Sequence, residues 1–231
     1  MKRSFSISKR LKSLYHWIRF FYIQRVRGFD VPSAPHFDSD ETARWFTAQM
    51  LQSRKYFEWG AGGSTYLAAS NQIPFTTIDS DRYFLSAVVR KIKKEGLYAK
   101  DYQTFLYANI GLTKVWGKPI IWGYLSKKRL ASFRKYSDFP VTSNEEMPDL
   151  ILVDGRFRVA CALKAFKVLS NRQEPWRLVV DDYTGRPNYA VLERFGRLEC
   201  YVGRMAIFNG VAVNSSYELD NAIFKYEDDF R

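Results

Sequence analysis

Apolar residues recur along this chain in two alternating patterns. Short apolar runs, typical of buried strands, lie at about residues 55–58, 75–79, 104–108, 150–154 and 176–180. Segments with helical spacing lie between them, at about 41–52, 64–70, 84–92 and 158–170. Asp81 precedes the third of these and is expected to cap it. This alternation predicts an α/β protein, a Rossmann-like, three-layer, doubly wound fold with a mostly parallel sheet. Two more runs, at 198–202 and 204–208, meet at Gly203 and predict a C-terminal antiparallel hairpin.

The first 37 residues differ from the rest, and we expect a domain boundary there, with 38–231 forming the main domain. Residues 1–27 hold eight Lys or Arg and no acid, and apolar residues recur there at helical spacing. A proline-marked connector follows at 31–37. Such a basic amphipathic helix can lie on an anionic membrane surface. It could equally pack across the domain as a lid or a dimer contact.

Charge and length narrow the classes of protein. The net charge of +12 suggests nucleic-acid binding, but outside residues 1–27 the chain has 28 basic and 24 acidic residues, so its body is only mildly basic. No apolar run of about 18 residues suggests a spanning helix. We expect a cytoplasmic protein, with a peripheral position at the inner face of a membrane left open. Cys161 and Cys200 lack metal-type spacing and are expected to be reduced core thiols.

A stretch at about 109–147 shows little regular pattern and is predicted to be an insertion. It contains several Trp and Gly residues and the basic run at 127–129. Long insertions in compact domains are more often functional loops or lids than neutral spacers.

The segment after the first predicted strand is a glycine-rich turn. Glu58 ends the strand, and Gly60, Ala61, Gly62, Gly63 and Ser64 lead into a helix. Glycines let a backbone approach a ligand closely, and the helix start offers free N–H groups. The G-x-G-G spacing is not the G-x-G-x-x-G of dinucleotide-binding folds, and no Gly-Lys-Ser/Thr follows as in a phosphate loop.

Acidic residues stand at four predicted strand ends. Glu58 and Asp79 follow the first two strands, Asp154 follows the fourth, and Asp181 with Asp182 follows the fifth. Ligands of doubly wound sheets bind beyond these carboxyl ends. The last three carboxylates should converge, and their repulsion would be relieved by Mg²⁺ or another divalent cation.

The turn resembles motif I of class I S-adenosylmethionine (SAM)-dependent methyltransferases, a strand followed by E/D-x-G-x-G. The resemblance implies that SAM binds here, with Glu58 near its ammonium group and the turn from Gly60 to Ser64 around its amino-acid end. Asp79 would accept hydrogen bonds from the ribose hydroxyls, with Asp81 as the alternative.

Residues 179–183, Val-Val-Asp-Asp-Tyr, are similar to metal-dependent O-methyltransferases of the catechol and macrocin types. That resemblance implies a metal held by Asp154, Asp181 and Asp182, which would position a hydroxyl of a glycan, a lipid-linked saccharide or a small metabolite.

One position departs from that pattern. Where those families keep a Lys or His base, this chain has Phe157, flanked by Arg156 and Arg158. Metal activation could suffice, another residue could serve, or the two arginines could bind an anionic acceptor beside Asp154. Helix-terminal surface charge is the alternative for both arginines.

Two other functions stay open. One is an RNA or protein methyltransferase, although the Asn-Pro-Pro-aromatic motif of amino-methylating nucleic-acid enzymes is missing, which makes a nucleic-acid substrate less expected. The other is a non-catalytic SAM-binding module. Neither the acceptor nor the oligomeric state follows from the sequence.

Overall fold

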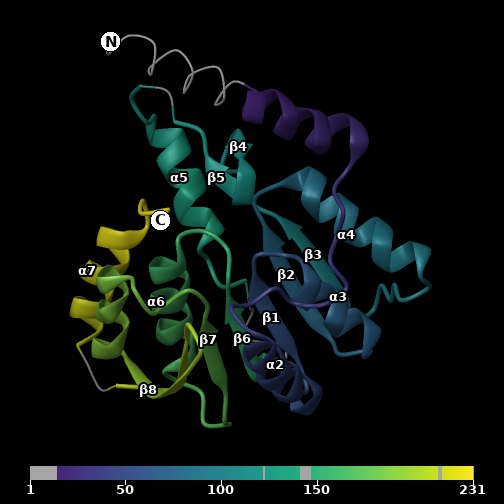
Figure 1. Cartoon of the computed structure of the whole chain (residues 1–231). Coiled ribbons are helices and arrows are strands. Elements are labelled where there is room, and N and C mark those ends of the chain that lie inside the picture. The colour runs from purple at the N-terminus through teal and green to yellow at the C-terminus, as the bar shows by residue number, and fades with distance from the viewer. Residues whose placement is uncertain (1–14, 122, 141–146, 213–214, 231) are drawn as a thin grey trace, which may run out of the picture.

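The computed structural model describes residues 15–121, 123–140, 147–212 and 215–230. A seven-stranded sheet forms its centre, in the order β3-β2-β1-β6-β7-β9-β8 (Figure 1). The first five of these are parallel, and β9 runs antiparallel to both β7 and β8. The strands are β1 (Tyr56–Trp59), β2 (Phe75–Asp79), β3 (Gln103–Tyr107), β6 (Leu150–Val153), β7 (Arg177–Val180), β8 (Gly196–Val202) and β9 (Met205–Val211). The predicted mostly parallel sheet with a C-terminal hairpin is confirmed.

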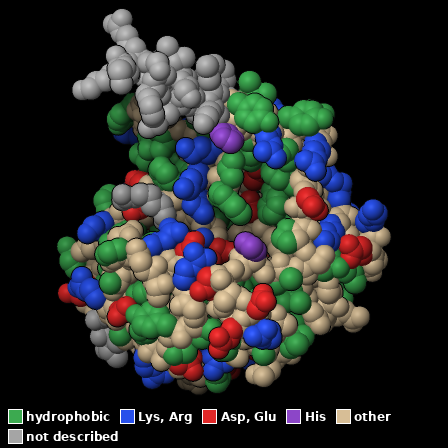
Figure 2. Space-filling model, in the orientation of Figure 1, with side chains coloured by type: hydrophobic (Ala, Val, Ile, Leu, Met, Phe, Trp, Pro, Cys, Tyr) green, Lys and Arg blue, Asp and Glu red, His purple; other side chains and the backbone are tan. Residues whose placement is uncertain are grey.

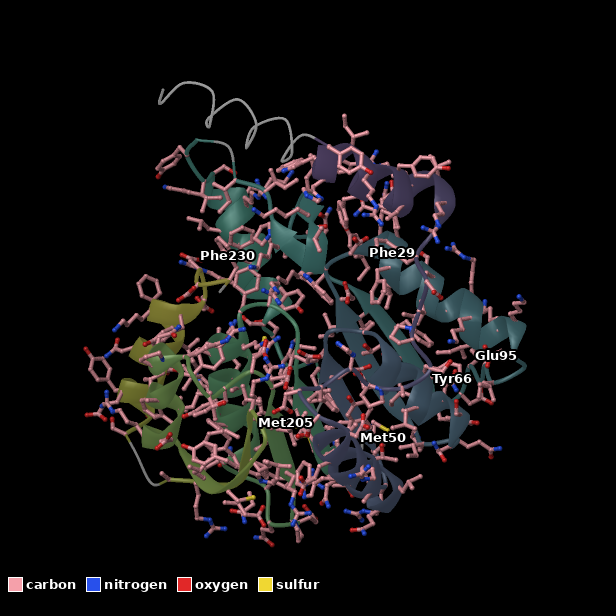
Figure 3. The ribbon with its side chains drawn as sticks, in the orientation of Figure 1. Phe29, Met50, Tyr66, Glu95, Met205 and Phe230 are labelled. Atoms are coloured by element: carbon pink, nitrogen blue, oxygen red, sulfur yellow. The ribbon has the colours of Figure 1, made fainter. Side chains whose placement is uncertain are left out.

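Helices cover both faces of the sheet, which confirms the three layers. One face carries α2 (Asp40–Gln52), α3 (Gly63–Ser70) and α4 (Arg82–Lys94), and the other carries α5 (Lys127–Tyr136), α6 (Arg158–Leu169) and α7 (Ser216–Tyr226). Successive residues of a strand point to opposite faces. In β6, therefore, Leu150 and Leu152 pack with the α2–α4 layer, whereas Ile151 and Val153 pack with the α5–α7 layer. Met50 and Met205, labelled in Figure 3, belong to the α2–α4 side.

The order of the strands creates a switch point. β1 pairs with β2 on one side and with β6 on the other, so the connections after β1 and β6 leave in opposite directions. Ligands of open α/β sheets bind in the crevice at such a point. The glycine turn and Asp154 follow these two central strands.

Some elements were not predicted. The insertion contains α5, whose sequence is too polar for a clear helical pattern, and a small hairpin of β4 (Thr113–Lys114) and β5 (Lys118–Pro119). Ser126 caps α5 by accepting from the Arg129 N–H at 3.3 Å. A 3₁₀ helix at Pro187–Arg194 and α7 were also missed. The core placement of Cys200 was wrong, because Cys200 is exposed on the edge strand β8, whereas Cys161 is buried.

The described part of the N-terminal region folds back on the main domain. Residues 15–22 are helical and continue into a π-helix at Ile23–Arg27. Phe29 packs edge-on against Phe84 of α4, with ring centroids 5.2 Å apart (Figure 3). Lys91 of α4 donates to the Val31 carbonyl of the connector at 2.7 Å. Of the two alternatives, packing across the domain is therefore observed for this part. Among the described residues, no helix is long and apolar enough to span a bilayer.

Candidate functional site

The three glycines of the turn have different surroundings. Gly60 has φ +104°, and a Cβ there would lie 2.9 Å from the Gly155 nitrogen. A Cβ on Gly63 would lie 1.9 Å from the Ala34 carbonyl oxygen of the connector. Gly62, in contrast, has open space in front of its Cα. Two glycines are thus required by contacts within the chain, and the third leaves room for a ligand.

Glu58 stabilises the turn through hydrogen bonds to its side chain. Its side chain is fully buried, and its carboxylate accepts from the Tyr56 hydroxyl at 2.7 Å, the Ser64 hydroxyl at 2.5 Å and the Thr65 hydroxyl. Burial raises the pKa of Glu58, and these hydroxyl donors counter part of that rise. Its oxygens and the Ser64 hydroxyl are therefore used within the protein. The predicted contact of Glu58 with an ammonium group stays a prediction.

Asp79, at the end of β2, lies directly against the glycine turn. Its carboxylate accepts from the Ala61 N–H at 3.1 Å and from the Asp81 N–H at 2.6 Å. Burial is the main reason that the pKa of Asp79 is raised to about 7. A carboxylate can accept further bonds beyond these two. Asp79 can therefore accept hydrogen bonds from the hydroxyls of a ligand, and Gly62 leaves room for that ligand beside it. Both features fit the methyl donor that the sequence resemblance implies.

Asp81 is occupied on both oxygens. Oδ1 caps α4 by accepting from the backbone N–H of Tyr83 at 2.9 Å and of Phe84 at 3.2 Å. Oδ2 accepts from the Gln24 amide at 2.7 Å, and both side chains are buried. The cap was predicted, but the contribution of Gln24 was not. The N-terminal π-helix thereby closes one side of the site.

The three predicted metal ligands converge, but they converge on Arg158. The Arg158 guanidinium lies 2.8 Å from an Asp154 oxygen, 3.4 Å from Asp182 and 3.9 Å from Asp181. It also donates to the main-chain carbonyls of Asp154, Gly155 and Asp181. Only 5% of its side chain is exposed. For Arg158, the surface-charge interpretation is therefore wrong.

This arrangement does not fit a divalent cation. The guanidinium stands between the carboxylates and supplies the positive charge that a metal would supply. Asp182 is paired twice more, with Arg186 at 2.9 Å and Arg204 at 3.3 Å. Among the described residues, no group of three or more His, Cys, Asp or Glu has a metal-binding arrangement. Metal assistance stays a prediction from the resemblance, and no step below depends on it.

Burial in this cluster raises the pKa values of Asp181 and Asp154. Burial, followed by the charge of Asp154, raises the pKa of Asp181 to about 7, against the opposite effect of Arg158. Burial also raises the pKa of Asp154, which Arg158 partly offsets. One oxygen of Asp181 is buried without a hydrogen-bond partner among the described residues. Asp154 is the more accessible of the two, with 33% of its side chain exposed.

Arg156, which follows β6, is half-buried and has no such pairing among the described residues. Its Nε is buried and has no hydrogen-bond partner within the described residues. Burial and the neighbouring charge of Arg158 lower its pKa. Its backbone N–H donates to the Tyr136 hydroxyl of α5 at 3.2 Å, so the insertion contributes to its position. A cation with spare donors suits an anionic group on a ligand.

The insertion packs against the site beside the residues that follow β2. A Cβ on Gly117, at the tip of the β4–β5 hairpin, would lie 2.9 Å from the Ser80 hydroxyl, which follows β2. Figure 2 shows a hollow in this face of the molecule, with acidic side chains inside it and Lys and Arg side chains along one side. The sequence offered no signal for Gln24 or Tyr136. Nothing in the local pattern links Gln24 to Asp81, which is 57 positions away, or Tyr136 to Arg156, which is 20 positions away.

Comparisons with known proteins agree with this fold. No family model matches the chain, and no curated protein matches it by sequence. Among solved structures, a methyltransferase-like protein from Silicibacter pomeroyi DSS-3 is similar over 86% of this chain and 100% of its own, with 26% identity and a TM-score of 0.69.

More distant matches include two proteins solved with SAH. They are an O-methyltransferase from Bacillus cereus (13% identity, 84% of this chain and 90% of that chain, TM-score 0.44) and the N-terminal domain of human METTL16 (10% identity, 87% and 82%, TM-score 0.44). The chain thus has the Rossmann-like fold of its methyltransferase-like structural neighbours.

Proposed function

We propose that this protein is a SAM-dependent methyltransferase that methylates a hydroxyl oxygen of an acceptor carrying an anionic group. The observation that carries the proposal is the contact between Asp79 and the Ala61 N–H, at 3.1 Å. It joins the acid after β2 to the glycine turn after β1 at the switch point, which is the donor site that the resemblance implies.

The donor would occupy the space in front of Gly62, with its ribose hydroxyls on Asp79. When bound there, SAM would supply a methyl group on a positively charged sulfur. The acceptor oxygen would bond to this methyl carbon as the carbon–sulfur bond breaks in line, and SAH would leave. The chain's task is mainly to align the two partners, which is the largest help an enzyme can give to such a transfer. Any side chain larger than hydrogen at residue 62 would enter this space.

Asp154 would take the hydroxyl proton. Its main chain lies against the glycine turn, with the Asp154 N–H donating to the Trp59 carbonyl at 3.0 Å. Burial raises the pKa of its carboxyl, which makes this carboxylate a stronger base than an exposed aspartate. Arg158 holds this carboxylate in place and compensates its charge. Phe157, at the position of the missing Lys or His, is fully buried against α5 and takes no part.

Arg156 would bind the anionic group of the acceptor, such as a phosphate or a carboxylate on a saccharide, a lipid-linked saccharide or a small metabolite. This assignment is supported by its buried Nε, which has no hydrogen-bond partner among the described residues. It also accounts for an arginine just before a helix start, where cations are mildly unfavourable.

Two measurements test the proposal. Titration calorimetry should detect binding of both SAM and SAH, and labelled SAM should transfer its methyl group to a fraction of a cell extract that binds an anion exchanger. In Arg156→Ala, the KM for that acceptor should rise about tenfold or more, with unchanged affinity for SAM. Arg54→Ala is the matched control, since Arg54 is 60% exposed and lies just before β1, at the amino ends of the parallel strands and away from the glycine turn at their carboxyl ends.

Each negative result has a distinct meaning. A protein that binds neither SAM nor SAH would refute the function. Binding without transfer to any fraction would favour the non-catalytic module. Transfer to neutral acceptors, with Arg156→Ala no worse than Arg54→Ala, would refute the anionic acceptor alone.

A further inference from the structure

The positive charge of this chain is concentrated in two segments. Residues 1–29 contain eight Lys or Arg, residues 102–137 contain seven, and neither segment contains an acidic residue. The rest of the chain holds 21 basic and 24 acidic residues and is therefore slightly acidic. In Figure 1, the helix of residues 15–22, the β4–β5 hairpin and the start of α5 lie together above the central sheet.

The described part of the N-terminal helix, residues 15–27, has one buried side and another side with exposed apolar residues. Phe20 and Gln24 face the main domain and are buried. Ile18, Tyr22 and Val26 lie on another side of the helix and are between 55% and 71% exposed. A helix that only anchored itself on the domain would need polar residues on this outer side.

The insertion presents apolar side chains of the same kind. Trp116, at the tip of the β4–β5 hairpin, is 76% exposed, and its backbone is in the left-handed region with φ +64°. That conformation is unfavourable for a residue with a large side chain and is kept when the surroundings impose it. The next residue, Gly117, is packed against Ser80, so the hairpin tip is fixed while the indole points outward. Tyr124, at 92%, is also exposed.

We propose that these apolar side chains and the exposed lysines between them form a docking surface for an anionic lipid bilayer. We define the docking surface by Ile18, Tyr22, Val26, Val115, Trp116 and Tyr124, with Lys114, Lys118, Lys127 and Lys128 as its cations; all ten side chains are exposed. Aromatic rings prefer the headgroup level of a bilayer, aliphatic side chains enter the boundary below it, and cations attract anionic lipids.

A bilayer explains this surface better than RNA does. Nucleic acids would use the lysines, and could stack on Trp116 or Tyr124, but they offer nothing to the aliphatic Ile18, Val26 and Val115. A bilayer uses all three types of side chain at once. Docking in this way places the hollow of Figure 2 close to the membrane, because the N-terminal helix and the insertion border the same site.

Vesicle flotation of the full chain tests the docking surface. We expect binding to vesicles of phosphatidylcholine mixed with phosphatidylglycerol, and much weaker binding to phosphatidylcholine alone. Each cation near the surface contributes about fivefold to partitioning, so Lys127→Gln/Lys128→Gln should lower it about 30-fold. Trp116→Ala should lower it about tenfold. The matched controls are Tyr217→Ala on α7, where the ring is 74% exposed, and Lys100→Gln in the loop before β3.

Three results would overturn the proposal. The first is an absence of binding to anionic vesicles, with circular dichroism showing the chain to be folded. The second is an equal loss of binding in the control variants. The third is RNA binding that displaces vesicles and that depends on Lys127 and Lys128 but not on Ile18 or Val26.

Discussion

Replacing Arg158 with Met tests the organisation of the carboxylate cluster most directly. The guanidinium lies 2.8 Å from Asp154, 3.4 Å from Asp182 and 3.9 Å from Asp181. At an effective dielectric constant of about 20, each contact represents about 4 to 6 kcal/mol of attraction, most of which offsets the desolvation of the buried charges. Removing one partner of a buried ion pair costs about 3 to 5 kcal/mol, because the remaining charges lose their compensation. We expect a loss of that size in the free energy of unfolding at pH 8.

The loss should depend on pH, and its sign follows from Asp181. The pKa of this carboxyl is about 7 in the folded protein and about 4 in an unfolded chain. Protonation of Asp181 therefore stabilises the fold fully below about pH 4, and this contribution is lost as the pH rises through about 7. Without Arg158 the folded pKa rises further. The cost of Arg158→Met should consequently be small at pH 5 and largest at pH 8.

Urea unfolding followed by tryptophan fluorescence at both pH values measures this difference. Arg204→Met is the control, because Arg204 is 51% exposed and, within the described part of the chain, forms ion pairs only with Asp182 and Asp38, so its loss should cost under about 1 kcal/mol. A loss for Arg158→Met that is absent, or equal at pH 5 and pH 8, would refute the reasoning.

Adding divalent ions tests whether Arg158 or a metal neutralises the three carboxylates. Mg²⁺ or Mn²⁺ should leave the unfolding midpoint of the natural chain unchanged. In Arg158→Met, the three carboxylates have lost their cation, and a divalent ion at about 100 times its dissociation constant should stabilise the fold by about 2.7 kcal/mol. Stabilisation of the natural chain that disappears in Asp181→Asn would show that the metal prediction is right and our interpretation of Arg158 wrong.

Three further predictions concern the donor side of the site. Gly62→Ala should unfold at nearly the same temperature as the unchanged protein but bind SAM about tenfold or more weakly in calorimetry. Gly63→Ala, whose Cβ would collide with Ala34, should instead lose stability. A stability loss in Gly62→Ala with unchanged stability in Gly63→Ala would contradict the assignment. Glu58→Gln should cost about 1 to 3 kcal/mol in urea unfolding, since glutamine keeps one accepting oxygen but replaces the other, which accepts from a hydroxyl here, with a donating NH₂ group, and a neutral effect would contradict that role. Because the pKa of Asp79 is about 7, SAM affinity should fall up to tenfold per unit below pH 7, and this dependence should vanish in Asp79→Asn.

Much of this fold follows from local pattern. The predicted strand at residues 75–79 matches β2, and Asp81 caps α4 as predicted, because a short apolar run and an Asp before a helix act on their nearest neighbours. The acids at the strand ends were also correctly grouped. Strands β6 and β7 are parallel neighbours, so their carboxyl ends lie at the same edge.

The tertiary structure decided how those groups are used. A sequence shows that Asp154, Asp181 and Asp182 carry like charges, but not which cation lies among them, and here it is Arg158 from the start of α6. It also shows three glycines, but not that Gly63 is small because the connector crosses it at Ala34. These outcomes depend on contacts between residues that are distant in the chain or that turn inward on folding. The local hydrophobic pattern therefore determined the layers of the fold and which acidic residues lie at the carboxyl ends of the parallel strands. Packing between segments determined which partner each charged group contacts.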